Sequence, residues 1–251
     1  GDGNYLAWYN LSRRQKIDVR VSGSVRIYSR SKVKDPFLDA KIKNKYLESQ
    51  KYWEKDNQVI KTKLSEILKD ISPQNSWEKA RLIHRFVVNH LQYSASKLTN
   101  DNLERLGAVT ALNNPTSSLS MEFTDLFIAL ARSAGIPARE LNGFAYTSNT
   151  NLRPLSLSKD ILHTWPEFWD DQQGWIMIDP TWENTTGGVN YFDKFDLNHI
   201  VFAIKGLSSQ QPVPVGSYQK TSPLKNQDVQ VSLKDQDFLR KPNLNIEILT
   251  P

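Results

Sequence analysis

The chain has 251 residues, 39% hydrophobic and 24% charged, a balance that excludes disordered and collagen-like proteins. Lysine and arginine exceed the acidic residues by 32 to 27. Because this excess is spread along the chain without a basic stripe, it predicts no nucleic-acid partner. No apolar run approaches the roughly 18 residues of a membrane span, so we expect any membrane attachment to lie in segments outside this sequence. Cysteine is absent, which excludes disulfides, thiolate metal sites and, as the sequence stands, a cysteine nucleophile.

The beginning of the chain predicts β-structure. Apolar residues alternate with polar ones between residues 5 and 29, most clearly in segments 16–21 and 24–28, as in half-buried antiparallel strands. A strand pair this short cannot bury a core by itself. We therefore expect it to pack on the rest of the chain or to be the end of an upstream domain.

The middle of the chain predicts helices. Residues 39–69 are charged and helical in composition, and 76–92 carry apolar side chains at helical spacing. The clearest helix covers 123–134 and ends at Gly135-Ile136-Pro137. Residues 97–119 are rich in helix-breaking residues and are expected to form a loop.

A strand is expected at 140–146, followed by a hairpin of segments 161–169 and 173–179. A three-residue loop between the hairpin strands would set His163 opposite Asp179, on the same face of the sheet. A loop one residue longer would set His163 against Pro180 instead.

The end of the chain again predicts a linker and strands. Segment 210–223 contains three prolines, and alternation returns near residues 229–231 and 245–248. We therefore divide the chain into N-terminal strands (residues 1–35), a core (36–209), and a linker with C-terminal strands (210–251).

The sequence contains four histidines. His84 and His90 are six residues apart on one predicted helix, so they face different directions, form no zinc pair, and are expected at the surface or its boundary. His199 lies in a turn-rich segment and joins no recognisable group. His163 is distinguished by Asp179, because a carboxylate beside an imidazole can orient a catalytic base. The alternative is a cross-strand polar pair without catalytic meaning.

Ser120 stands at the start of the best predicted helix. A helix N-terminus activates a nucleophile placed there and supplies N–H donors to an oxyanion. The alternative is that Ser120 only caps the helix. The residues alone favour the cap, since no base lies nearby in the sequence.

Three segments carry a family resemblance. The run Ser120-Met121-Glu122-Phe123 through Gly135-Ile136-Pro137-Ala138-Arg139 resembles the segment of the transglutaminase-like superfamily in which a cysteine opens a helix. Segments 163–169 and 175–181 resemble the histidine and aspartate motifs of that family. The resemblance covers residues 45–205 and implies an α+β fold, in which helices pack on an antiparallel sheet in the papain-like manner with flanking strands.

The resemblance implies a Cys-His-Asp triad, with Ser120 at the cysteine position and His163 and Asp179 as its partners. It also implies acyl transfer through a thioester, as peptidase, amidase, or protein-glutamine transamidase or deamidase. Serine is a poor substitute for cysteine, so this form is expected to be inactive. Either serine replaces a natural cysteine by engineering, or the chain is a natural non-catalytic relative that binds peptide or glycan.

The remaining expectations concern the surroundings of the triad. Trp165 and Trp175 are candidates to line a substrate cleft, and Gln92, Tyr93 and Asn114 are candidates for a second oxyanion donor. No cofactor or metal is expected, because no calcium-loop motif is present. The expected partner is a peptide or protein carrying a glutamine or amide bond, including cell-wall peptide. The start without methionine indicates a trimmed chain, and we expect an extracytoplasmic or cell-surface location.

Overall fold

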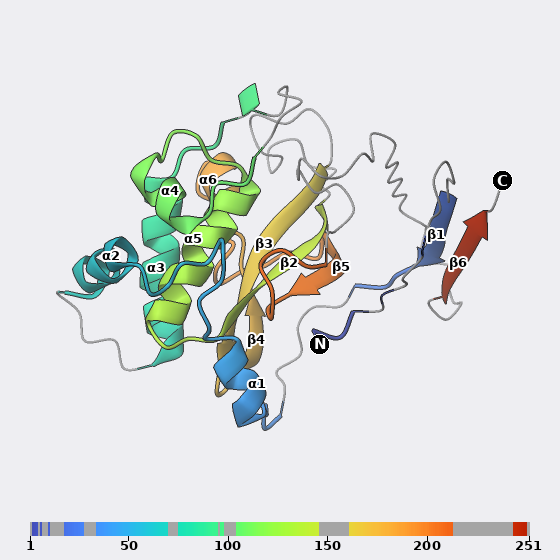
Figure 1. Cartoon of the computed structure of the whole chain (residues 1–251), viewed down its shortest axis with the longest axis horizontal. Helices are drawn as coiled ribbons and strands as arrows, with labels where there is room; N and C mark the ends of the chain where they lie inside the picture. The colour runs from blue at the N-terminus through green and yellow to red at the C-terminus, as the bar shows by residue number, and fades with distance from the viewer. Residues whose placement is uncertain are drawn as a thin grey trace.

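The computed structural model shows a layer of helices packed on one face of a β-sheet, with a two-stranded ribbon set apart from both (Figure 1). The structure describes residues 2–4, 6, 10, 18–27, 34–69, 75–94, 96–97, 104–145, 161–212 and 243–249. The elements in chain order are β1 (Asp18–Ser24), α1 (Ala40–Lys45), α2 (Gln58–Leu68), α3 (Ser76–His90), α4 (Ala108–Asn113), α5 (Ser120–Ser133), β2 (Ala138–Ala145), β3 (Ile161–Asp170), β4 (Gly174–Met177), α6 (Pro180–Thr185), β5 (His199–Lys205) and β6 (Asn243–Leu249).

The larger sheet has the order β4-β3-β2-β5, and every neighbouring pair in it is antiparallel. Helix α5 packs on β2 and β3, and α3 also reaches β3. The predicted α+β class is therefore confirmed. Among the described residues, no helix combines the length and the apolar composition needed to cross a membrane.

Helix α5 forms the centre of the core, and every residue from Ser120 to Arg132 is buried. Its apolar side chains pack against α2, α3 and α4 on one side and against the sheet on the other. Two contacts fix its direction along β3: the Thr124 hydroxyl donates to the Thr164 carbonyl at 3.2 Å, and the Phe127 ring packs near Phe168. The start of α5 therefore lies toward the end of β3 that carries residues 161–163.

Two predicted segments need correction. The expected loop at 97–119 contains helix α4, which is only six residues long and starts after Gly107. The helical stretch expected at 39–69 is two helices, α1 and α2, separated by residues 46–57. Short helices are set by tertiary packing more than by local pattern, which explains both differences.

The ribbon pairs the N-terminal strand β1 with the C-terminal strand β6, with Val21 opposite Ile246. Val21 is 61% exposed, so the expected half-burial of this strand is wrong for that residue. Residues 25–27, expected in a second strand, are not in one. The predicted linker beyond residue 212 and the expected strand at 229–231 lie outside the described residues. The division into three regions stays a prediction.

A buried cluster of charges joins α5 to the sheet. The Arg105 guanidinium donates to both oxygens of Asp125 on α5 and to Glu140 on β2, the latter at 2.6 Å. Lys205 on β5 pairs with Glu140 at 2.9 Å. The side chains of these four residues are each at most 2% exposed. Two cations thus balance two carboxylates, in a place where an unpaired charge is costly.

Replacing Arg105 by methionine is expected to lower the free energy of unfolding by about 3–5 kcal/mol, because it leaves one buried negative charge without a partner. Urea denaturation measures this loss. The double variant Arg105→Met/Glu140→Gln removes one charge of each sign and should recover part of it. A loss below about 1 kcal/mol in the single variant, or no recovery in the double, would show that the cluster does not hold α5 on the sheet.

Candidate functional site

The end of β4 places Asp179. The strand stops at Met177, the Ile178 N–H donates to the Pro166 carbonyl at 3.1 Å, and the chain then turns into α6. Asp179 caps this helix: its Oδ1 accepts the Trp182 N–H at 2.9 Å, and Pro180 occupies the first helical position.

The predicted register of the hairpin is wrong by two residues. Trp169 pairs with Trp175, not with residue 173, and the loop is 171–173. Gly174 adopts a left-handed φ of 77°, and the Asp170 side chain accepts the N–H groups of residues 172 and 173, so the hairpin closes one residue later than expected. A shift of two residues keeps the same face of the strand, which is why Asp179 still lies on the His163 side.

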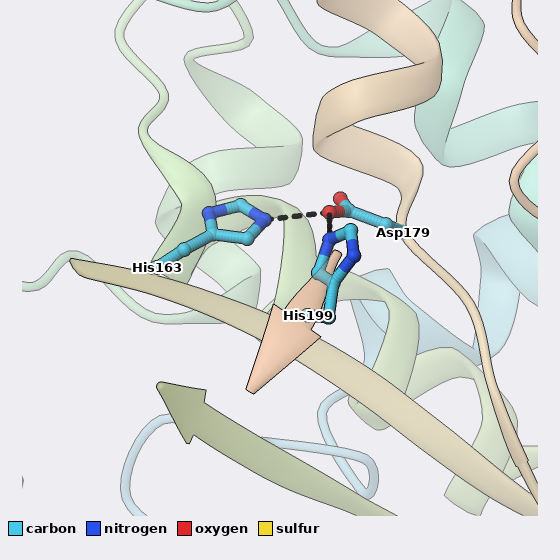
Figure 2. A group of neighbouring side chains, drawn as sticks. All are labelled: His163, Asp179 and His199. Atoms are coloured by element: carbon cyan, nitrogen blue, oxygen red, sulfur yellow. Dashed lines mark hydrogen bonds and ion pairs between the residues drawn. The ribbon is translucent and has the colours of Figure 1, made fainter. Parts of the chain in front are cut away.

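His163 and Asp179 form a buried pair. The Nε2 of His163 lies 2.6 Å from the Oδ2 of Asp179, and the two side chains are 1% and 0% exposed (Figure 2). Within the described part of the chain, the Nδ1 of His163 has no hydrogen-bond partner. One ring nitrogen is therefore held by a carboxylate, while the other is left to accept a proton.

Ser120 is the first residue of α5 and not its cap. The capping position is Leu119, whose N–H donates to the Glu122 carboxylate at 2.8 Å. Glu122 also accepts the Leu106 N–H at 3.1 Å, and its burial raises its pKa. This carboxylate fixes the chain as it enters the helix, so the purely capping interpretation of Ser120 is wrong. Since α5 begins toward the His163 end of β3, the fold brings the helix start and the histidine to the same end of the sheet.

The two candidate cleft tryptophans lie in different places. Trp165 is fully buried and stacks on His163, with ring centroids 5.6 Å apart. Trp175 is opposite Trp169, six residues along β3 from His163, or about 20 Å at the rise of a strand. It packs under Arg139, whose guanidinium carbon is 3.9 Å from the ring centre. The structure therefore brings Trp165 to the pair and does not bring Trp175 there.

The three candidate oxyanion donors surround the segment that leads into α5. The N–H of Gln92 donates to the Pro115 carbonyl at 2.8 Å, and Tyr93 forms a bridge with Ser118. The N–H of Asn114 donates to Thr110 within the end of α4. The backbone donors of Gln92 and Asn114 are thus engaged, and only their side chains remain as predicted donors. Tyr93 stays a prediction.

His199 belongs to the site, although the sequence had indicated no group for it. It begins β5, and its Nε2 lies 3.0 Å from the same Oδ2 of Asp179 that His163 contacts. Its Nδ1 lies 2.7 Å from Asp196 Oδ1. Figure 2 shows the two imidazoles approaching the Asp179 carboxylate from different strands. The local signal was the spacing of Asp196 and His199, but the link to Asp179 requires the folded sheet.

Gly143 allows β5 to come this close. It pairs with His163 on one side and with Val201 on the other, next to an irregularity in the β2–β5 register. A Cβ at this position would lie 1.8 Å from the Ile200 carbonyl oxygen and 3.0 Å from the Trp165 ring. Only glycine fits between these groups without moving the backbone that carries His199.

The charges in the site favour an ionised carboxylate and a protonated His199. Burial alone would raise the pKa of Asp179. The positive charges on His163 and His199, and the hydrogen bonds they donate, outweigh burial and hold this pKa well below its usual value. Burial alone would lower the pKa of His199, but Asp179 and Asp196 outweigh it and raise the pKa to about 9. His199 is therefore an imidazolium at neutral pH.

The raised pKa of His199 predicts a pH-dependent stability. The protonated ring contributes its full stabilisation of the folded state below 6.5, the pKa of the unfolded histidine. This contribution is lost as the pH rises through the folded pKa of about 9. The loss across this window is expected to be about 3 kcal/mol. Urea denaturation at a series of pH values measures it as the difference between the parent and His199→Gln. A difference that stays constant between about pH 6 and pH 10 would contradict the expectation.

The other two histidines differ from each other. His84 is 1% exposed and its Nε2 contacts Glu183 of α6 at 2.9 Å, so the expected surface or boundary position is wrong. His84 is adjacent to the apolar stripe of α3 at Ile83 and Val87, and this position in the sequence could have predicted its burial. His90 is partly buried at the end of α3, where a boundary position was expected, and contacts the Leu112 carbonyl.

His163, Asp179 and His199 are also the described residues whose ligand atoms come close enough for one metal ion, all within 4.8 Å. These same atoms are joined by hydrogen bonds of 2.6 and 3.0 Å. An ion would enter only by displacing both shared protons. The arrangement is that of a hydrogen-bonded acid–base group.

Comparisons with known proteins find one matching family model and one curated relative at low identity. Residues 65–180 match the family model described as Transglutaminase-like superfamily. A protein-glutamine gamma-glutamyltransferase of Pseudomonas aeruginosa is 24% identical over 186 residues, which are 72% of this chain and 26% of that protein. The chain thus spans about a quarter of the length of this curated relative.

Two solved structures are similar. One, from Cytophaga hutchinsonii, is assigned as a cysteine protease (20% identity, TM-score 0.45, 66% of this chain and 55% of that one). The other is the periplasmic domain of TgpA from Pseudomonas aeruginosa (19% identity, TM-score 0.42, covering 60% of this chain and 52% of that one). The family match includes Ser120 and His163 and reaches one residue beyond Asp179. Residues 65–180 of this chain therefore match the transglutaminase-like superfamily.

Proposed function

We propose that this chain is the serine form of a cysteine-dependent acyltransferase, with position 120 as the nucleophile, His163 as the base and Asp179 as its orienting carboxylate. The observation that carries the proposal is the buried His163, held by Asp179 through Nε2 and without a described partner at Nδ1. Helix α5 starts at the same end of the sheet, where a thiol would be activated by the helix N-terminus.

The chemistry follows for a cysteine at position 120. His163 takes the thiol proton through Nδ1, and the thiolate attacks the carbon of a carboxamide. The oxyanion is stabilised by the N–H of residue 120, which has no helical acceptor at the first position of α5. Collapse of the tetrahedral species breaks the C–N bond, the leaving amine takes the proton from His163, and a thioester remains. Water then gives hydrolysis, and a primary amine gives transamidation.

The substrate we propose is the glutamine side chain of a peptide or protein. Support comes from the curated relative, which is a protein-glutamine gamma-glutamyltransferase. Peptide-bond cleavage uses the same steps and is the second reaction to test. From the sequence we further propose cell-wall peptide among the substrates and an extracytoplasmic location, which fractionation of cells producing the full-length protein tests.

The serine at position 120 is proposed to be a replacement of a natural cysteine. A hydroxyl is far less acidic than a thiol, so a site built for a thiolate–imidazolium pair does not activate it. Reading codon 120 of the natural gene checks this directly. A serine codon there would instead favour a non-catalytic binding module for peptide or glycan.

Covalent labelling tests the proposed nucleophile. The variant Ser120→Cys is expected to react with a low concentration of an electrophilic glutamine-like probe, detected as a single mass adduct at that position. Ser120→Cys/His163→Ala should react much more slowly, because the imidazole no longer generates the thiolate. Ser133→Cys is a matched control, since it places a more exposed thiol at the opposite end of the same helix. Equal labelling of positions 120 and 133 would refute the proposal.

A further inference from the structure

Among the described residues, three donors hold the Asp179 carboxylate, and His163 is one of them. Its Oδ1 is engaged with the Trp182 N–H at 2.9 Å, while its Oδ2 is shared by His163 at 2.6 Å and His199 at 3.0 Å. Because an ionised carboxylate only accepts hydrogen bonds, both Nε2 atoms donate. Rotation about χ2 moves both carboxylate oxygens together, so it strains the helix cap at Oδ1 as well as the hydrogen bonds at Oδ2. The second imidazole adds a further restraint on this rotation.

His199 is itself fixed from the far side. Its Nδ1 donates to Asp196 at 2.7 Å, and its side chain is fully buried. Aromatic rings enclose it, with centroids at 4.6 to 6.2 Å; they belong to Phe195, Trp165, Trp182 and Tyr191. The titratable groups that face it are Asp179, Asp196, His163 and Tyr191. Turning the ring over would break the hydrogen bonds that its two nitrogens make to Asp196 and Asp179, so the ring is held in a single orientation.

We propose that His199 is a positioning residue: anchored on Asp196, it holds the Asp179 carboxylate in the one orientation that keeps the proton of neutral His163 on Nε2. This inference rests on the proposed function for its catalytic meaning, but its structural content can be tested without any activity. With the proton on Nε2, the Nδ1 of His163 is the acceptor, as the proposed reaction requires. If the carboxylate rotates, the neutral ring also populates the tautomer with the proton on Nδ1, which cannot take a proton from position 120.

The test uses the Ser120 protein with ¹⁵N-labelled histidine, because two-bond ¹H–¹⁵N correlations identify the tautomer of each neutral ring. The parent is expected to show a single Nε2–H tautomer at His163. His199→Phe keeps the ring shape without the donors, and we expect a mixture of tautomers. His199→Gln can return a donor near the Nε2 position, and we expect the single tautomer to be largely restored.

The matched control is His84→Phe, which removes the contact of another buried histidine with a carboxylate, that of Glu183, and leaves both imidazoles at Asp179 in place. It should leave the pattern of His163 unchanged. A single tautomer in a folded His199→Phe protein overturns the proposal, and so does a mixture in His84→Phe. If His199→Phe does not fold, Asp196→Ala replaces it, because it removes the anchor and leaves the ring. An unchanged pattern of His163 in that variant would also overturn the proposal.

A kinetic measurement separates this inference from the proposed function. In the Ser120→Cys background, His199→Phe is expected to lower kcat by about 10²-fold with little change in KM, and His199→Gln to recover most of it. No activity in Ser120→Cys itself would refute the proposed function, while the tautomers would still decide the role of His199. Activity with an equal loss of kcat in His199→Gln and His199→Phe would contradict positioning through the hydrogen bond.

Discussion

Replacing Ser120 by cysteine is expected to raise kcat for carboxamide hydrolysis by about 10⁶-fold, the usual penalty for lacking the nucleophile of an intact triad. The gain is large because the fold already supplies the other parts. His163 is oriented by Asp179, and the entry to α5 is fixed by Glu122. Only the acidity of the group at position 120 has to change.

The measurement is ammonia release from a glutamine-containing peptide, with and without a primary amine. Ammonia with glutamate indicates hydrolysis, and an isopeptide adduct indicates transamidation. Ser118→Cys is the control, because it places a thiol two residues earlier, at a buried position outside the helix. Activity there equal to that of Ser120→Cys would show that the helix start is not the site. Absence of activity in Ser120→Cys toward both glutamine and peptide bonds would refute the enzyme proposal.

Replacing Asp179 by asparagine in the Ser120→Cys background is expected to lower kcat by about 10⁴-fold. The amide oxygen can still cap α6, so the fold should be retained. Its NH₂ group, however, would face the Nε2 atoms of His163 and His199. His163 would then have to accept at Nε2 and carry its proton on Nδ1, the wrong nitrogen for removing a proton from the thiol.

Steady-state kinetics on the same glutamine peptide measure this loss, and thermal unfolding checks that the variant is folded. Asp170→Asn is the matched control. It is a buried aspartate on the same hairpin, and its side chain accepts two N–H groups of the turn. A folded Asp179→Asn protein within about tenfold of the parent would exclude Asp179 from the triad.

The features predicted correctly from the sequence have short-range causes. The apolar repeat of α5, ended by Gly135, predicts a helix wherever it packs, and its observed span is Ser120–Ser133. The strand at Ala138–Ala145 follows from composition in the same way. The fold class came from a resemblance that depends on three separate segments, and the match over residues 65–180 agrees with it.

The features predicted incorrectly depend on the tertiary structure or on a single backbone angle. The hairpin register depends on Gly174 and Asp170. The left-handed φ of Gly174 and the hydrogen bond accepted by the Asp170 side chain shift the loop by one residue. His199 lies 20 residues from Asp179 in the sequence, and it reaches Asp179 only because β5 pairs with β2 in the folded sheet. No local sequence pattern could therefore predict this contact. Trp175 was a candidate for the cleft, but β4 places it opposite Trp169, toward the other end of β3 from His163.

The double role of Asp179 also has an evolutionary consequence. One oxygen serves the helix and the other serves the two imidazoles. Selection for folding alone is satisfied by asparagine, serine or threonine at this position, since each can cap α6. Selection for an acceptor shared by two imidazole donors favours the carboxylate. In a lineage that lost catalysis long ago, random substitution would therefore replace Asp179 by another capping residue. His163 and His199 would then no longer be conserved for their hydrogen bonds to the carboxylate. A chain that carries all three intact beside a serine at position 120 is what a recent loss of the thiol would leave.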